Sequence, residues 1–191
     1  MKIGLFFGSF NPLHIGHMVL AQYMVEFTDL EQVWFVVSPQ NPFKEKSSLL
    51  NHHHRLMMVR VATEDNRKLK ASDIEFGLSQ PSYTVDTLAY IQEKYPKHEF
   101  SLIMGSDNLQ HFRKWKNADA ILASHQLYVY PRPKTKDCEL AKHPKVQITQ
   151  APLMEVSASF IRKSIHDQKD ISYLLPEKVW KYVDEMNFYK K

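Results

Sequence analysis

The sequence is poor in the features that mark secreted and membrane proteins. It has one cysteine, Cys138, which excludes an internal disulfide and suits a reducing compartment. Its apolar runs fall well short of the roughly 20 residues that span a bilayer. The apolar opening at residues 3–7 leads straight into a turn and does not resemble a signal peptide. We therefore expect a cytoplasmic protein with no membrane segment.

A strong excess of charge is also missing. Lys and Arg outnumber Asp and Glu by 25 to 21, a mild excess that favours small anionic ligands such as nucleotides. The sequence shows no basic stripe with interleaved aromatic residues of the kind that follows a nucleic-acid backbone. We therefore expect no nucleic-acid partner, and we interpret most of the charges as a solvated surface.

What the chain does contain is enough apolar material for one core. It has 191 residues, of which 43% are hydrophobic, and it shows neither internal repeats nor a low-complexity linker. This length and composition predict a single domain over residues 1–191, with a C-terminal helical segment from about residue 157. The oligomeric state stays open, a homo-oligomer included.

Short apolar segments alternate with longer amphipathic ones. The short segments predict strands at residues 2–7, 32–38, 100–104 and 126–130, with further short candidates at 73–76 and 146–150. The longer segments predict helices at 17–27, 53–64, 85–94, 118–124, 159–167 and 178–186. This order predicts an α/β fold, a doubly wound, mostly parallel sheet with helices on both faces. Ligands then bind at the carboxyl ends of the strands.

The first predicted strand leads into the segment GSFNPLHIGH at residues 8–17, which brings His14 and His17 to the start of a helix. Residues three apart lie on the same face of a helix. A helix N-terminus after a strand offers unpaired N–H groups and a partial positive charge, which suit phosphate. Nucleotidyl transfer needs positioning and charge neutralisation more than covalent chemistry, and histidine donors can supply both.

Two simpler interpretations of the histidine pair are polar residues at a helix start and two ligands of a metal site. Gly8, Pro12 and Gly16 place the pair in a defined strand-turn-helix setting, and the neighbouring sequence offers no cysteine or further acidic ligand for zinc. The segment is neither a Walker loop nor a G-x-G-x-x-G fingerprint. We therefore favour a phosphate site with no metal held by the protein.

The segment 8–17 resembles the HxGH signature of the nucleotidylyltransferases, a superfamily with a Rossmann-like fold. A second segment, SASFIRK at residues 157–163, places hydroxyls ahead of Arg162 at a predicted helix start, where hydroxyls can cap the helix and an arginine can clamp phosphate. Taken alone it would be an ordinary capped helix with an exposed arginine. Paired with the first segment, it resembles the Ser/Thr-x-x-x-Ile-Arg signature, which implies that Arg162 meets the β- and γ-phosphates of ATP.

Three further stretches, at residues 82–88, 105–115 and 39–44, resemble the nicotinate-nucleotide adenylyltransferase branch. Thr84, in SYTVDTL at residues 82–88, matches a segment that helps seat the pyridine nucleotide. Gly105 and Asp107 match positions beside the ATP ribose, although a helix cap is the simpler interpretation of Asp107. Trp115 matches a tryptophan that stacks on the nicotinate ring, whereas without its neighbours it would be an ordinary core or surface aromatic.

Two basic residues complete the predicted acceptor site. Lys44 follows the second strand in NPFK, where family members often have Pro-Pro-His-Lys, and it could reach an acceptor phosphate. Arg132 matches a frequent Arg-Pro after a strand, but Lys134 replaces the glycine that usually follows. The resemblance implies contacts with the nicotinate nucleotide for Lys44, Thr84, Trp115 and Arg132.

Other conspicuous residues are interpreted as structural. The histidines at 52–54 point about 100° apart on a helix and cannot readily converge on one ion, so we interpret them as a solvated helix start. Core positions are expected for the following residues: Phe6, Phe7, Trp34, Phe35, Met57, Met58 and Trp180.

The resemblance implies transfer of AMP from ATP to nicotinate mononucleotide by direct in-line attack, giving nicotinate adenine dinucleotide and pyrophosphate. His14, His17 and Arg162 are the implied catalytic residues, and Mg²⁺ is expected to arrive bound to ATP. The residues implied at ATP are Gly8, Ser9, Phe10, Gly16, His17, Gly105, Asp107, Ser157, Phe160, Ile161 and Arg162. The alternatives are an adenylyl- or cytidylyltransferase with another acceptor, such as phosphopantetheine, and a regulatory nucleotide-binding module without turnover.

Overall fold

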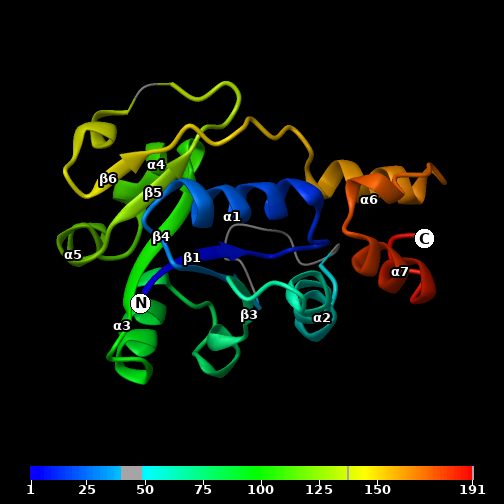
Figure 1. The fold of residues 1–191 in the computed structure, drawn as a ribbon, viewed down its shortest axis with the longest axis horizontal. Helices are drawn as coiled ribbons and strands as arrows, with labels where there is room; N and C mark the ends of the chain where they lie inside the picture. Colours follow the sequence, from blue (N-terminus) through cyan, green and yellow to red (C-terminus); the bar gives the residue numbers. More distant parts are fainter. Residues whose placement is uncertain (40–48, 137, 191) are drawn as a thin grey trace.

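One parallel sheet runs through the molecule (Figure 1). The computed structural model describes residues 1–39, 49–136 and 138–190. In these ranges six strands pair in the order β3-β2-β1-β4-β5-β6, and every pairing is parallel. The strands are β1 (Lys2–Gly8), β2 (Gln32–Val37), β3 (Leu69–Ser72), β4 (Glu99–Gly105), β5 (Leu127–Tyr130) and β6 (Val146–Ile148).

Helices cover both faces of this sheet. In the described chain they are α1 (Ile15–Phe27), α2 (His52–Thr63), α3 (Thr84–Lys94), α4 (Ser106–His111), α5 (Ala118–Ser124), α6 (Ala158–His166) and α7 (Glu177–Glu185). One apolar cluster joins the sheet to α1, α2, α6 and α7, and a second joins it to α3, α4 and α5. Figure 1 shows α1 and α3 on opposite sides of the sheet.

The central strands are apolar because both of their faces are buried. In β2, Phe35 belongs to the first cluster and its neighbour Val36 to the second, and both are 0% exposed. Successive side chains of a strand point to opposite faces, so a strand covered on both sides becomes a continuous apolar run. The chain winds outward from β1 to β3 and then returns to start again at β4 beside β1. Ligands of such sheets bind beyond the carboxyl ends of the strands at this reversal.

The predicted α/β class and most of the predicted elements are confirmed. The candidate strand at 73–76 is wrong, because residues Ile74–Gly77 form a 3₁₀ turn, and β3 lies just before it. Met57 is also not a core residue, since it is 41% exposed on the outer face of α2. His52 and His54 are half-buried against aromatic rings and are not fully solvated.

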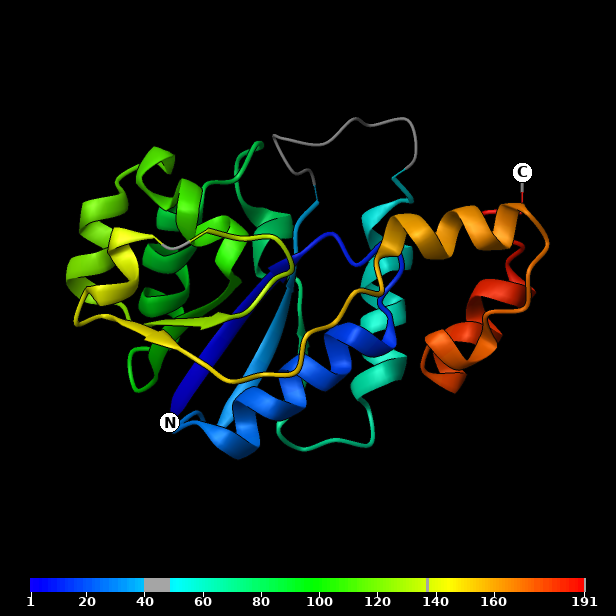
Figure 2. The same cartoon turned by 90° about the horizontal axis from the view of Figure 1, so that it is seen from above.

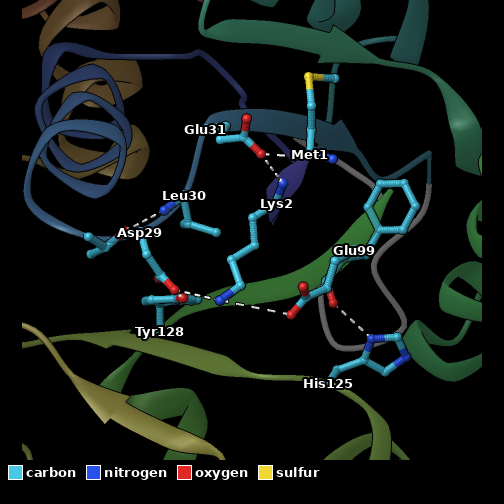
Figure 3. A network of polar contacts seen from close by, with 10 residues as sticks. Met1, Lys2, Asp29, Leu30, Glu31, Glu99, His125 and Tyr128 are labelled. Atoms are coloured by element: carbon cyan, nitrogen blue, oxygen red, sulfur yellow. Dashed lines mark hydrogen bonds and ion pairs between the residues drawn. The ribbon is translucent and has the colours of Figure 1, made fainter. Parts of the chain in front are cut away.

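A polar network ties the amino ends of the strands together, at the edge opposite the predicted ligand side (Figure 3). The Lys2 ammonium donates to Asp29 at 2.5 Å and lies 3.9 Å from Glu99. The Tyr128 hydroxyl donates to the other oxygen of Asp29. These contacts join β1, β4 and β5 to the loop before β2, so we interpret this edge as structural.

The C-terminal helices α6 and α7 lie at one end of the molecule, beyond α2 (Figures 1 and 2). Both helices are strongly amphipathic, and their apolar faces pack in the first cluster. Ile161, Val179 and Val183 on these faces are all 0% exposed. This packing brings a segment from the end of the sequence beside the turn that follows β1. Among the described helices, none has the length and hydropathy to cross a bilayer.

Candidate active site

The turn after β1 is built around a buried aromatic ring. Phe10 is 2% exposed and takes a positive φ of 46°, a conformation that is unfavourable for residues with a Cβ. A Cβ on Gly8 would lie 2.7 Å from the Phe10 ring, so this position requires glycine. Because the Phe10 side chain is enclosed, any contact of this residue with ATP would come from its backbone.

The two predicted histidines lie together at the start of α1. Helix α1 begins at Ile15, two residues earlier than predicted, with His14 as its N-cap residue. The His14 and His17 rings stack with their centroids 3.7 Å apart. The backbone N–H of His14 donates to Nδ1 of His17 at 3.2 Å. An acceptor Nδ1 means that the proton of the neutral ring sits on Nε2, which makes Nε2–H the donor.

His14 is kept neutral by its surroundings. It is 5% exposed, and its Nδ1 is buried with no hydrogen-bond partner in the described structure. Burial, together with the nearby positive charge of Arg132, lowers the pKa of His14 to about 4. A Cβ on Gly16 would approach Nδ1 of His14 to 3.1 Å, so glycine makes room for this ring. At neutral pH His14 can therefore offer hydrogen bonds but no charge.

Arg162 contacts the same turn from α6. Its Nη1 donates to the backbone oxygen of Asn11 at 2.7 Å, and the side chain remains partly exposed. The N-cap of α6 is Ser157, whose Oγ accepts the Phe160 N–H at 3.2 Å. The structure thus brings the two predicted signature segments together. They meet at the contact between Arg162 and Asn11, two residues that are 151 positions apart in the sequence.

Side-chain exposure distinguishes the remaining residues of the α6 segment. Phe160 is 53% exposed and available for contact, whereas Ile161 is 0% exposed and packs in the core. Ile161 therefore serves to seat α6 on the sheet, and any contact of Ile161 with ATP would involve its backbone.

A second group of predicted residues gathers at the carboxyl ends of β4 and β5. Arg132 Nε lies 3.8 Å from the Asp107 carboxylate. A Cβ on Gly105 would contact the same carboxylate and lie 3.0 Å from Cγ of Arg132, so a larger residue would displace both side chains. Lys134 takes a positive φ of 61°, a conformation that glycine adopts most easily. The structure thus groups Arg132 with the residues predicted at ATP.

The residues predicted for the pyridine nucleotide form a separate group. Thr84 is half-buried at the first position of α3. Trp115 is half-buried against Phe112, with ring centroids 5.1 Å apart. The next residue, Lys116, donates to Asp86 of α3 at 2.9 Å, so the two segments are tied together. Lys44 lies outside the described residues.

Three residues near the histidines were not predicted as site residues. Arg55 is 0% exposed and donates to the backbone oxygens of Ser9, Ser38, Pro39 and Leu50 at 2.7–2.9 Å. Asn11 is 3% exposed, and its Oδ1 accepts the Tyr189 hydroxyl at 2.7 Å. The sequence signal for Arg55 is a lone arginine at the spacing of the apolar face of α2. For Tyr189 the sequence offers no signal, because its contact spans 178 residues.

Metal-binding geometry is not evident in the part of the chain that the structure describes. Within it, no three His, Cys, Asp or Glu side chains come close enough together to hold an ion. Histidine, arginine and backbone donors are the groups around the turn after β1, and such groups recognise phosphate oxygens. The site can therefore bind an anion between β1 and β4.

Known proteins resemble this chain in sequence and in fold. The family model described as cytidylyltransferase-like matches residues 5–164. Relatives named probable nicotinate-nucleotide adenylyltransferase occur in Flavobacterium johnsoniae, at 56% identity, and in Flavobacterium psychrophilum, at 58% identity, each alignment covering 100% of both chains. The fold is also similar to that of Plasmodium falciparum nicotinic acid mononucleotide adenylyltransferase complexed with NaAD, with a TM-score of 0.81, 21% identity and coverage of 99% of this chain and 97% of the other. The chain belongs to the nicotinate-nucleotide adenylyltransferase family, within the cytidylyltransferase-like group.

Proposed function

We propose that this chain transfers the AMP moiety of ATP to nicotinate mononucleotide and releases pyrophosphate, the reaction for which its family is named. The observation that carries the proposal is the meeting of His14, His17 and Arg162 around one turn at the reversal between β1 and β4. The acceptor phosphate attacks the α-phosphorus of ATP as pyrophosphate leaves, so no protein nucleophile is required.

The histidines act on the phosphate that is transferred. His17 donates through Nε2–H, because the His14 backbone occupies its Nδ1 at 3.2 Å. His14 is neutral, with a pKa of about 4, and contributes a hydrogen bond. Positive charge comes from Arg162, which holds the β- and γ-phosphates of the leaving group. Donors fixed before reaction stabilise the developing charge with little reorganisation.

Magnesium enters with the nucleotide as part of the substrate. Mg²⁺ prefers phosphate oxygens and water over a dedicated protein cage. When bound, it neutralises charge on the triphosphate. We propose that Gly105 and Asp107 contact the ribose of ATP and that Arg132, next to Asp107, also faces the nucleotide. The pairing of Arg132 with Asp107 favours this placement over the acceptor side.

The acceptor site lies between α3 and the segment carrying Trp115. Trp115 offers a flat, half-buried ring for a pyridine. Thr84 begins α3, where N–H groups without helical partners can donate to an anion. Lys116 supports this arrangement by bridging the two segments. Lys44 remains a proposed contact to the acceptor phosphate.

An acceptor assay tests the proposal. Purified protein is incubated with ATP and Mg²⁺, and pyrophosphate release is measured with nicotinate mononucleotide, nicotinamide mononucleotide or phosphopantetheine. We expect robust release with nicotinate mononucleotide. Release with phosphopantetheine alone would keep the mechanism and overturn the acceptor, whereas no release with any of the three would favour a regulatory module.

A further inference from the structure

The last residues of the chain return to the turn that follows β1. Asn187 and Tyr189 have positive φ values of 54° and 64°, and the Phe188 N–H donates to the Val183 oxygen at 3.0 Å. A left-handed conformation is unfavourable for residues with a Cβ unless other contacts impose it. Asn187 takes this conformation as the residue that ends α7, because its N–H donates to the Asp184 oxygen and the Phe188 N–H donates to the Val183 oxygen, which is a Schellman cap. Tyr189 lies beyond this cap, so its positive φ requires a tertiary contact.

Tyr189 makes the contact that fixes this path. Its hydroxyl donates to Asn11 Oδ1 at 2.7 Å, and the same oxygen accepts the Leu50 N–H at 3.3 Å. Burial raises the pKa of the Tyr189 phenol, so the hydroxyl keeps its proton and remains a donor. Asn11 is 3% exposed, so its amide is held in one orientation by these two donors.

Arg162 binds the backbone of the same asparagine. Its Nη1 donates to the Asn11 backbone oxygen at 2.7 Å. The charges of Arg162 and Arg55 also act on the Tyr189 phenol, so these side chains lie near one another. Asn11 therefore links three parts of the site, namely the turn leading to His14, the arginine from α6 and the end of the chain.

We propose that Tyr189 is a positioning residue for adenylyl transfer: through Asn11 it holds Arg162 and the turn after β1 in the geometry that receives the triphosphate. This inference rests on the proposed function. It assigns the C-terminal segment a part in the active site in addition to its packing on α2. Tyr189 acts through Asn11 and takes no part in the chemical step.

Tyr189→Phe removes the hydroxyl and keeps the ring, so the packing of the segment is retained. The loss of one neutral hydrogen bond in a positioned network corresponds to about a 3- to 10-fold loss of rate. We expect kcat/KM for ATP to fall by about this factor, while KM for nicotinate mononucleotide is unchanged. The thermal midpoint is measured alongside to verify folding.

Tyr182→Phe is the matched control. It removes a hydroxyl from the same C-terminal segment, one that lies 2.8 Å from Nδ1 of His54 and, within the described residues, makes no hydrogen bond to the turn after β1. We expect this variant to keep the wild-type kcat/KM for ATP. An equal loss in both variants would show that Tyr189 has only a packing role and would overturn the proposal.

A double-mutant cycle with Arg162→Lys separates positioning from general destabilisation. If Tyr189 acts through Arg162, its substitution has an effect of less than about twofold once the guanidinium is gone, because the two losses share one cause. If the two losses were independent, Tyr189→Phe would lower kcat/KM by the same factor in the wild-type and the Arg162→Lys backgrounds, and this result would contradict the proposal. Wild-type kinetics of Tyr189→Phe would contradict it as well.

Isothermal titration calorimetry with Mg-ATP compares the ATP affinity of wild type and Tyr189→Phe with no acceptor present. We expect Tyr189→Phe to weaken binding by about 3- to 10-fold relative to wild type, and unchanged affinity with unchanged kcat would overturn the proposal. Wild-type protein that binds Mg-ATP but fails to use nicotinate mononucleotide would refute the proposed acceptor, which is a separate result from a failure of the Tyr189 inference.

Discussion

At the scale of the residue, His14 is a histidine that the fold keeps unprotonated. Its pKa is about 4, owing to burial and the charge of Arg132, against about 6.5 in an unfolded chain. Between these values the unfolded chain binds more protons than the folded chain, so stability falls as pH decreases through the window. We expect His14 alone to remove about 2 kcal/mol of the free energy of unfolding between pH 7 and pH 5.

Urea denaturation at both pH values measures this loss. The His14→Gln variant should show a smaller decrease between pH 7 and pH 5, since it lacks the group that takes up the proton. His111→Gln, which replaces an exposed histidine of α4, should keep the wild-type decrease. Parallel pH dependence in wild type and His14→Gln would mean that another group accounts for the acid sensitivity.

His17 carries the second prediction at this scale. Its Nε2–H is fixed as the donor, and Phe6 and Phe10 hold the ring edge-on at 6.0 and 5.1 Å. Removing one preorganised donor to a developing charge commonly costs about 10²- to 10³-fold in rate. We expect His17→Ala to lower kcat for pyrophosphate release by about this factor while the protein still folds. Near-normal turnover with an unchanged melting temperature would refute its role.

At the scale of the element, Arg55 joins α2 to the carboxyl ends of β1 and β2. Burial lowers the pKa of Arg55 to about 10, so the guanidinium remains charged at neutral pH. In the described chain no carboxylate lies within ion-pair distance of it, and its partners are backbone oxygens, those of Ser9 and Ser38 among them. Helix α2 therefore fixes the turn that carries the phosphate site.

Arg55→Met would remove the four hydrogen bonds that the buried guanidinium donates to backbone oxygens. We expect a loss of about 3 kcal/mol or more in the free energy of unfolding, because hydrogen bonds from a charged donor contribute about 1.5–3 kcal/mol each. Arg60→Met is the control on the same helix, since Arg60 is 55% exposed and pairs with Asp73 at 3.3 Å. Its effect should stay within about 1 kcal/mol. Equal effects of the two substitutions in chemical denaturation would contradict a special role for Arg55.

Elements were predictable from sequence where local pattern and tertiary packing agree. Strands β1 and β2 are buried on both faces, which gives them continuous apolar runs. Helix α7 is buried on one face, which gives it an amphipathic pattern. Strand β3 was missed because it has four residues and includes the exposed Lys70, so its pairing with β2 determines it more than its sequence does. The prediction of a strand at residues 73–76 failed for the same reason, because the sequence does not distinguish this short segment from the 3₁₀ turn at Ile74–Gly77.

The site was predictable to a similar degree. The two signature segments place His14, His17 and Arg162 from motif and spacing alone. Their precise setting was not predictable, because Nδ1 of His17 accepts from a backbone N–H and Asn11 contacts Tyr189, which lies 178 positions away. Contacts of such sequence separation leave no periodic pattern in the chain, so they become visible only in the fold.

At the scale of the whole molecule, the C-terminal helices share their core with the sheet. Ile161 and Ile165 of α6 and Val179 and Val183 of α7 are at most 5% exposed, and they belong to the cluster that contains Phe35 of β2. Helix α7 also reaches the end of α2 through Lys178, whose ammonium lies 2.5 Å from Glu64 and Asp65, the two residues that follow this helix. We therefore propose that the described chain folds as one cooperative domain.

Trp180 offers a test of this proposal, because it packs against the first cluster, whereas Trp34 and Trp115 contact the second. In a variant with Trp34 and Trp115 replaced by Phe, fluorescence reports α7 alone, and far-ultraviolet circular dichroism reports all helices. A two-state domain gives coincident urea transitions by both probes. An earlier Trp180 transition would show that residues 157–191 unfold separately. Since this segment carries Arg162 and Tyr189, the ATP site would then be lost before the sheet unfolds, and added Mg-ATP would raise the first midpoint alone.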